Sequence, residues 1–240
     1  MTMIRFYSPH IATTRQLTPE DSAHCVRVLR HVAGDEIEVV DGEGNLYACV
    51  IADANPKATS VEIESVEKLP VHWPATVAVA VAPTKNIDRI EWLVEKMTEI
   101  GVDEIITLRC DHSERKEVKT ERLLKIIVSA MKQSLKATLP RLQPMTPFGD
   151  MIERYKHFPA RFIAHCDNDS EKKLLRQVLP PATDTIIIIG PEGDFSPAEI
   201  SRAKAAGFVA VSLGKSRLRT ETAALSALAT FHFINETSIE

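Results

Sequence analysis

Hydrophobic residues in the C-terminal two-thirds of the chain fall into short unbroken runs that alternate with stretches of helical spacing. Thr185–Ile189 contains four consecutive isoleucines, which is typical of a parallel strand buried on both faces. Across Ile87–Ile100 the apolar residues recur at helical spacing, and Gly101 follows at a C-terminal cap position. Similar strands are predicted at 77–81, 104–108, 161–166 and 210–213, and helices near 120–135, 170–179, 197–206 and 221–234. The alternation predicts an α/β fold, with a mostly parallel sheet and helices on both faces.

The first 70 residues follow a different pattern, in which the apolar runs are shorter. Strand-like runs occur at 4–7, 37–40, 46–51 and 61–66, and the sequence DGEGN at 41–45 predicts a hairpin. Thr18-Pro19 predicts the start of one helix. Short strands need closure or cover, so we expect a small β-barrel. Pro70 and Pro74 mark residues 71–75 as a linker, which gives predicted domains at 1–70 and 76–240.

Composition narrows the class of protein. The chain is 44% hydrophobic and 26% charged, as in ordinary soluble globular proteins. It has no apolar signal-like segment at its start and no run long enough to cross a bilayer, so we expect a cytoplasmic protein without membrane contact. The four cysteines are scattered and are expected to be buried, and the eight histidines show no ligand spacing, so no metal is expected. Because the net charge is −4, any nucleic acid would have to bind a local basic patch.

Two loops follow predicted strands and precede predicted helices. The first is Gly190-Pro191-Glu192-Gly193, after which Ser196 and Glu199 form a helix-starting capping box. The second has the sequence LGKSRLRTET at 213–222. Taken alone, either loop could be an ordinary turn, and neither matches a dinucleotide or P-loop fingerprint. Two such loops at the carboxyl ends of strands nevertheless favour a shared ligand site, and a glycine without Cβ would let a ligand approach the main chain.

Longer motifs in the same region carry a family resemblance. GPEGDFSPAE and LGKSRLRTETAAL resemble the two cofactor motifs of the SPOUT superfamily of RNA methyltransferases, and most closely those of the 16S ribosomal RNA uridine-N3 methyltransferase family. VEKMTEIGVDEI, HSER and KQSLKATLP resemble further motifs of that family, while RFYSP and CVRVLRHVAGDEIEVVDGEG resemble its N-terminal PUA-like RNA-binding domain. The resemblance implies a C-terminal domain with a deep trefoil knot, S-adenosylmethionine as cofactor, a homodimer, and methylation of one small-subunit rRNA uridine at N3.

The resemblance also implies site residues. Arg219 is expected to stabilise charge on the uracil oxygens, and Glu192 and Glu221 are expected either to orient Arg219 or to accept the N3 proton. An acid at the position of Glu221 would also be favoured by the helix dipole alone. The expected cofactor-binding residues are Ile188, Ile189, Gly190, Pro191, Glu192, Gly193, Leu213, Gly214, Ser216, Leu218, Arg219 and Thr222.

RNA contacts are expected from both domains, although any one of these cations taken alone fits a solvated surface charge better than an RNA contact. The candidates are Arg5, Arg27 and Arg30 on the barrel, and Lys85, Arg115, Lys132, Gln133 and Lys136 on the catalytic domain. The chain departs from the family pattern at two places. Asp194 replaces the last glycine of GPEGG, and Leu135-Lys136 replace Gly-Arg. Asp tolerates left-handed backbone better than most residues, so we expect the first loop to survive this substitution.

Two alternatives to the uridine-N3 activity stay open from sequence. The first is a SPOUT enzyme that acts on tRNA or on another rRNA base, because the two loops report the cofactor and not the substrate. The second is a non-catalytic RNA-binding factor in ribosome assembly that keeps the fold without turnover. A dinucleotide-dependent oxidoreductase is disfavoured, because no glycine fingerprint follows the first strand of the predicted sheet.

Overall fold

The computed structural model describes residues 4–166 and 172–236. The chain folds into two compact units, one made of residues 1–72 and 127–139 and the other of residues 73–126 and 140–240. The segment 127–139 therefore belongs to the first unit although it lies, in sequence, inside the second. These compact units do not follow the predicted boundary at 71–75, and the division into functional domains there stays a prediction.

The first unit is built on a four-stranded sheet in the order β1-β2-β3-β4. Its strands are β1 (Arg5–Tyr7), β2 (Glu36–Val40), β3 (Asn45–Asp53) and β4 (Ser60–Lys68). β1 pairs parallel to β2, and the remaining pairs are antiparallel. The predicted helix is present as α2 (Pro19–Ala23), which continues into the π-helical turn η1 (His24–Val28). A short helix that was not predicted, α1 (Ile11–Thr14), precedes it. As the sequence predicts, Thr18 caps α2 by accepting a hydrogen bond from Asp21 N.

The predicted hairpin between β2 and β3 holds the segment 127–139. Asp41 shapes this hairpin, because its Oδ1 accepts hydrogen bonds from Glu43 N at 2.8 Å and Asn45 N at 3.1 Å. Gly44 N then donates to Ala137 O at 3.0 Å. Met131 and Ala137 are buried together with Val40 of β2 in a small apolar cluster. The hairpin at 41–45, which the sequence predicts correctly, thus binds the segment 127–139, which the sequence places in the catalytic domain.

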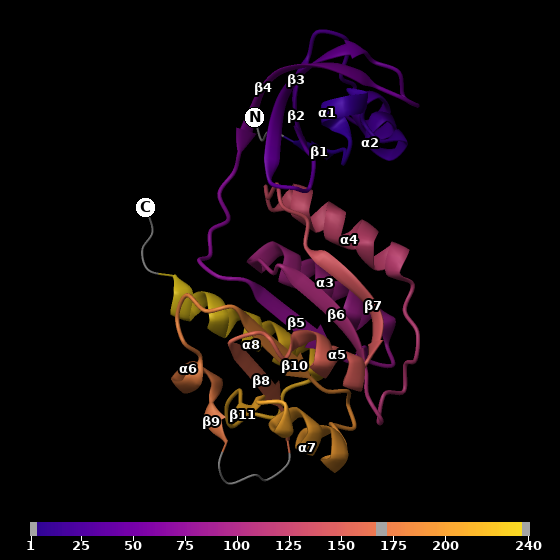
Figure 1. The fold of residues 1–240 in the computed structure, drawn as a ribbon. Helices are drawn as coiled ribbons and strands as arrows, with labels where there is room; N and C mark the ends of the chain where they lie inside the picture. Colours follow the sequence, from indigo (N-terminus) through magenta and orange to yellow (C-terminus); the bar gives the residue numbers. More distant parts are fainter. Residues whose placement is uncertain (1–3, 167–171, 237–240) are drawn as a thin grey trace. The chain divides into compact units, whose positions relative to one another are not determined.

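The second unit is an α/β sandwich around a seven-stranded parallel sheet (Figure 1), which confirms the predicted fold class. The strand order is β7-β6-β5-β10-β8-β11-β9. The strands are β5 (Val77–Val81), β6 (Glu104–Arg109), β7 (Arg141–Pro147), β8 (Ala160–Ala164), β9 (Lys173–Leu174), β10 (Thr185–Ile189) and β11 (Val209–Ser212). All five residues of β5 and of β10 are buried, as expected for strands covered on both faces.

Helices cover both faces of this sheet. They are α3 (Ile87–Ile100), α5 (Phe148–Tyr155), α6 (Leu175–Val178), α7 (Pro197–Ala205) and α8 (Thr220–Asn235). A further helix, α4 (Thr120–Gln133), starts in the second unit and ends in the first. α5 and α7 share an apolar cluster with Ile186 and Ile188, whereas α3 and α8 pack side by side and α8 also contacts β5 and β10. The predicted helix at 170–179 is shorter than expected: β9 and α6 occupy 173–178, and residues 170 and 171 lie outside the described part. None of the helices within 4–166 and 172–236 has both the length and the apolar character required to cross a bilayer.

Candidate functional site

The loop after β10 is fixed by the segments that follow three neighbouring strands. Glu192 Oε1 accepts a hydrogen bond from Lys85 N at 3.0 Å, beyond the end of β5. His112 Nδ1, beyond the end of β6, lies 3.1 Å from both Gly193 O and Asp194 O. Asp194 Oδ2 accepts from Cys166 N, beyond β8, at 2.8 Å. The loop is therefore a rigid junction at the carboxyl edge of the sheet.

Asp194 adopts the conformation that the sequence analysis allows for it. Its φ of 62° is left-handed, which Asp tolerates better than most non-glycine residues. Close packing inside the protein explains why both Gly190 and Gly193 lack a side chain. A Cβ on Gly190 would lie 3.0 Å from the Phe195 ring, and one on Gly193 would lie 3.2 Å from His112 Cβ. At both positions the missing side chain leaves room for the protein's own side chains, and the close approach of a ligand to these glycines stays a prediction.

The loop after β11 has the opposite character. Residues 214–217 are exposed, and Leu213 and Leu218 are half-buried. Gly214 has a φ of 136° and nothing within 4 Å of the place that a Cβ would occupy. Arg219 is exposed at the N-cap of α8. This loop offers main-chain groups and two partly covered leucines to a ligand, with little protein packed against it.

The two loops meet at one hydrogen bond. Thr220 Oγ1, in the first turn of α8, donates to Gly190 O at 3.2 Å, although the strand order puts β8 between β10 and β11. The neighbouring Glu221 is 7% exposed, and its Oε1 lies 3.8 Å from Arg89 Nε. Glu221 Oε2 is buried and has no hydrogen-bond partner within the described residues. A buried carboxylate oxygen without a partner is costly, so this atom marks a position that a ligand donor would satisfy.

The structure thus brings together the two predicted loops and places Glu221 beside them, but it pairs that carboxylate with a residue that the sequence analysis missed. Arg89 belongs to α3, and no local sequence motif predicts its contact with Glu221, which lies 132 positions later in the chain. No hydrogen bond or ion pair joins Arg219 to Glu192 or Glu221 in the described segments. Ile188 and Ile189 are buried at the end of β10, Pro191 is buried, and Ser216 and Thr222 are exposed.

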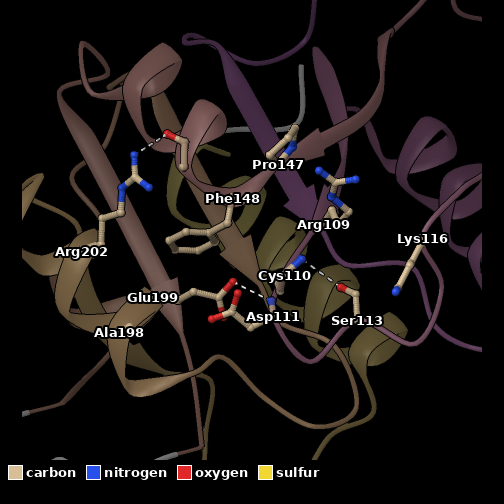
Figure 2. Close-up of a pocket in the computed structure, with 11 residues that line it drawn as sticks. Arg109, Cys110, Asp111, Ser113, Lys116, Pro147, Phe148, Ala198, Glu199 and Arg202 are labelled. Carbon is tan, nitrogen blue, oxygen red and sulfur yellow. Dashed lines mark hydrogen bonds between the residues drawn. The ribbon is translucent and has the colours of Figure 1, made fainter.

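A cavity of about 390 Å³ opens at the same edge of the sheet (Figure 2). Its walls come from the end of β6 and the segment after it, from the start of α5, and from the first two turns of α7. Glu199 of the predicted capping box accepts hydrogen bonds from Ser196 N at 2.9 Å and Asp111 N at 3.0 Å. Burial raises the pKa of the Cys110 thiol, and the neighbouring Glu199 charge adds to the shift. Residues of the HSER and SPAE motifs line this cavity. The sequence indicated each motif separately, but it did not predict that the two motifs would lie around one cavity.

The predicted RNA-binding residues are divided between the units. Arg27 and Arg30 are exposed on the first unit, as expected. Lys132, Gln133 and Lys136, assigned from sequence to the catalytic domain, belong instead to the first unit. There Lys132 Nζ lies 2.6 Å from the buried Asp21 carboxylate. The hairpin contacts described above are the physical reason for this change.

The remaining candidates are held by contacts within their own units. Arg5 Nε lies 2.8 Å from Glu38 Oε2, and Arg5, Lys132 and Gln133 all line a first-unit cavity of about 560 Å³. In the second unit Lys85 Nζ lies 3.1 Å from Glu114 Oε2, and Arg115 Nε donates to Thr84 O at 3.0 Å. Several of these cations therefore have a structural partner in addition to any RNA contact.

The remaining expectations from sequence concern the cysteines and the possibility of a metal site. Cys25, Cys49 and Cys110 are buried, but Cys166 is exposed because it lies just beyond the end of β8. Burial raises the pKa of both Cys25 and Cys49 to about 11. Within 4–166 and 172–236, no group of three or more His, Cys, Asp or Glu side chains has an arrangement that could hold a metal ion.

Family models match both parts of the chain. The model described as an RNA methyltransferase domain matches residues 71–232, and the model described as an RNA methyltransferase PUA domain matches residues 17–64. This chain belongs to the RNA methyltransferase domain family. The two conjoined loops, Glu221 and the cavity all lie within the part of the chain that the first model covers.

Three relatives with solved structures or curated names are similar to this chain over almost their whole length. A "probable rRNA-methyltransferase" from Porphyromonas gingivalis is 41% identical, with 97% of this chain and 98% of that chain covered and a TM-score of 0.91. Ribosomal RNA small subunit methyltransferase E of Bacillus subtilis is 28% identical, with 94% of this chain and 92% of that protein covered. A Neisseria gonorrhoeae enzyme of the same name, solved with bound S-adenosyl methionine, is 26% identical over 96% and 97% of the chains, with a TM-score of 0.82.

Proposed function

We propose that this protein transfers the methyl group of S-adenosylmethionine to N3 of a uridine in the small-subunit (16S) ribosomal RNA. The names of its relatives support the RNA class, and the solved complex of one relative supports the cofactor. The observation that carries the proposal is the junction of the two loops, where Thr220 binds Gly190 O and Glu221 keeps a buried oxygen without a partner. The N3 position rests on the motif resemblance.

The residues present fit the cofactor. The 213–218 loop leaves its main chain exposed at Gly214 and places Leu213 and Leu218, both half-buried, beside it, which suits an adenine and a ribose. The buried Ile188 and Ile189 end the adjoining strand. Glu221 Oε2 offers an acceptor for an ammonium or hydroxyl donor of the ligand. Bound there, S-adenosylmethionine would supply an activated methyl group on its sulfonium.

The chain's own contribution to the reaction is position and charge. Uracil N3 carries a proton at neutral pH, so negative charge develops on the uracil oxygens as that proton leaves. Arg219, exposed at the start of α8, is the cation that would stabilise this charge. Glu221 would accept the proton or hold a ligand donor, and Arg89, whose Nε lies 3.8 Å from Glu221 Oε1, would orient the carboxylate. Glu192 is bound to Lys85 N, so it would maintain the loop rather than orient Arg219.

The homodimer and the trefoil knot belong to the same proposal. Trp92 on α3 is 44% exposed and Phe233 on α8 is 77% exposed, and these two helices pack side by side. Exposed aromatic side chains on neighbouring helices form an apolar surface that a second copy of the chain could cover in a homodimer. A knot is supported by the path after β11, because the chain passes the end of β8 before Thr220 reaches Gly190.

The test uses the full-length protein and the rRNA of a strain that lacks it. Calorimetry should detect S-adenosylmethionine binding, and mass mapping of nucleosides should show one 3-methyluridine in small-subunit rRNA that disappears in the deletion strain and returns on complementation. A different methylated nucleoside, or a change in tRNA instead, would replace the uridine-N3 activity with another RNA methylation. An absence of cofactor binding would favour a non-catalytic assembly factor.

A further inference from the structure

The cavity of Figure 2 is bordered by three cationic side chains that none of the predicted sites includes. They are Arg109 at the end of β6, Lys116 in the segment after it, and Arg202 on α7. All three are exposed, and the cavity between them holds about 390 Å³. Three cations from three separate elements around one hollow form a site for an anion rather than a random scatter of surface charge.

The cations differ in how they are held. The side chains of Arg109 and Lys116 have neither a hydrogen bond nor an ion pair to the described residues, so their charges are available to a ligand. Arg202 is fixed in place, because its Nη2 donates to Gly149 O at 3.3 Å. A Cβ on Gly149 would overlap the Arg202 guanidinium group, so only glycine at this position lets the guanidinium lie against the start of α5.

The start of α5 adds donors to the same cavity. Phe148 and Gly149, the first two residues of α5, line it, and the N-cap residue Pro147 provides no side-chain cap. The N–H groups of this first turn lack intrahelical acceptors and carry part of the positive end of the helix dipole. Together with the guanidinium and ammonium groups, they give an anion both hydrogen-bond donors and charge.

Two carboxylates, those of Glu199 and Asp111, also line the cavity and offset part of this positive charge. Glu199 accepts hydrogen bonds from Ser196 N and Asp111 N with its two oxygens. Asp111 Oδ2 accepts from Ser196 Oγ at 2.6 Å. In Figure 2 these two carboxylates lie close together, whereas the Arg202 guanidinium points away from them towards the start of α5. Their hydrogen bonds join the start of α7 to the segment after β6, and the three cations outnumber them around the cavity.

We infer that this cavity binds a phosphodiester group of the substrate RNA, next to the cofactor loops. The inference rests on the proposed function, since it takes RNA as the substrate. A backbone phosphate needs several donors without sequence preference, which suits two guanidinium groups, one ammonium group and a helix start. The Phe195 ring packs against both Phe148 of this cavity and Gly190 of the first cofactor loop, so the same rigid wall serves both sites.

The deciding experiment measures RNA affinity against salt concentration for the full-length protein. The variant Arg109→Gln/Lys116→Gln should lower the slope of log K against log salt by about 1.4, because each lost single-strand phosphate contact contributes about 0.7. The control Arg141→Gln/Lys156→Gln removes two exposed charges from the opposite edge of the same sheet. It should leave the slope within experimental error of the wild type. Equal slopes for the two double variants would overturn the inference.

A second variant separates geometry from net charge. Gly149→Ala keeps every charge but displaces the Arg202 guanidinium, so it should weaken RNA binding several-fold while cofactor binding by calorimetry stays unchanged. An unchanged RNA affinity would remove Arg202 from the site. If wild-type protein binds the cofactor and methylates rRNA while all these variants bind RNA normally, the phosphate site fails and the proposed function survives. If the wild type itself does not methylate rRNA, the proposed function fails.

Discussion

The two loops at the carboxyl edge of the large sheet have similar glycine-containing sequences but opposite physical states. The loop 190–194 is tied to the ends of β5, β6 and β8 through Glu192, His112 and Asp194. The loop 213–219 is largely exposed, and its Gly214 exchanges two hydrogen bonds with the hydroxyl of Ser212 at the end of β11. The difference shows that the first loop is a finished part of the scaffold, whereas the second has the exposed main chain that the proposed cofactor site requires.

If this distinction is correct, changes in the exposed loop should impair the reaction and changes in the fixed loop should impair stability. The largest effect is expected at Arg219. Arg219→Ala should lower kcat by a factor of about 10² to 10³, because loss of one preorganised donor to developing charge costs about 2.7 to 4 kcal/mol. Cofactor affinity by calorimetry and the unfolding midpoint should stay near the wild-type values, since Arg219 is exposed.

A matched control lies two residues away in the same loop. Arg217 is also exposed, so Arg217→Ala removes the same charge from the 213–219 loop without removing the cation at the start of α8. Methyl transfer by Arg217→Ala should fall much less than by Arg219→Ala. Equal losses in the two variants would mean that the loop contributes only its net charge, and full activity in Arg219→Ala would take Arg219 out of the site.

The next effect is expected in the fixed loop, at Asp194. Asp194→Ala should destabilise the second unit by about 2 kcal/mol, because it loses a hydrogen bond worth about 1 kcal/mol and places alanine in a left-handed conformation that costs about 1 kcal/mol or more. Asp194→Gly should cost less, since glycine tolerates a φ of 62°. Asp194→Asn should be nearly neutral, because it keeps both the acceptor and the left-handed tolerance.

Chemical denaturation followed by tryptophan fluorescence can measure this series. The protein has two tryptophans, Trp73 and Trp92, and both belong to the second unit, so the signal reports that unit. The order Asn, Gly, Ala from most to least stable is the expected result. If all three variants have the same stability, neither the Cys166 N contact nor the left-handed backbone strengthens this loop.

The same comparison explains how far the sequence alone could go. The isoleucine run of β10 and the Ser196–Glu199 capping box depend on neighbours along the chain, and both were predicted correctly. Strand β7 was missed because Pro144 and Pro147 disfavour a strand, and they are tolerated only because β7 lies at the sheet edge. The loop 190–194 is fixed by residues that are distant in sequence, and the loop 213–219 lacks such partners among the described residues. Hydrophobic periodicity describes only neighbours along the chain, so it cannot predict these contacts.

The site shows the same limit. Both loops and Glu221 could be named from motifs, but the partner of Glu221 is Arg89 on another element. Lys132, predicted on the catalytic domain, lies in the first compact unit because the hairpin at Asp41 holds the segment 127–139 there. The cavity beside Arg109 and Arg202 was not predicted, since it forms only where the ends of β6, α5 and α7 converge. Motifs therefore identified the residues, and tertiary contacts decided their partners.

The smallest effect is expected where the two loops touch. Thr220→Val keeps the shape of the side chain but removes the hydroxyl that donates to Gly190 O, so it should cost about 1 kcal/mol in unfolding free energy. Because this bond sets the spacing between the fixed loop and the exposed loop, cofactor affinity should fall several-fold as well. Thr220→Ser keeps the donor and should restore most of both quantities. If valine matched serine in cofactor affinity, the two loops would act independently, and the contact between them would be packing without a role in ligand binding.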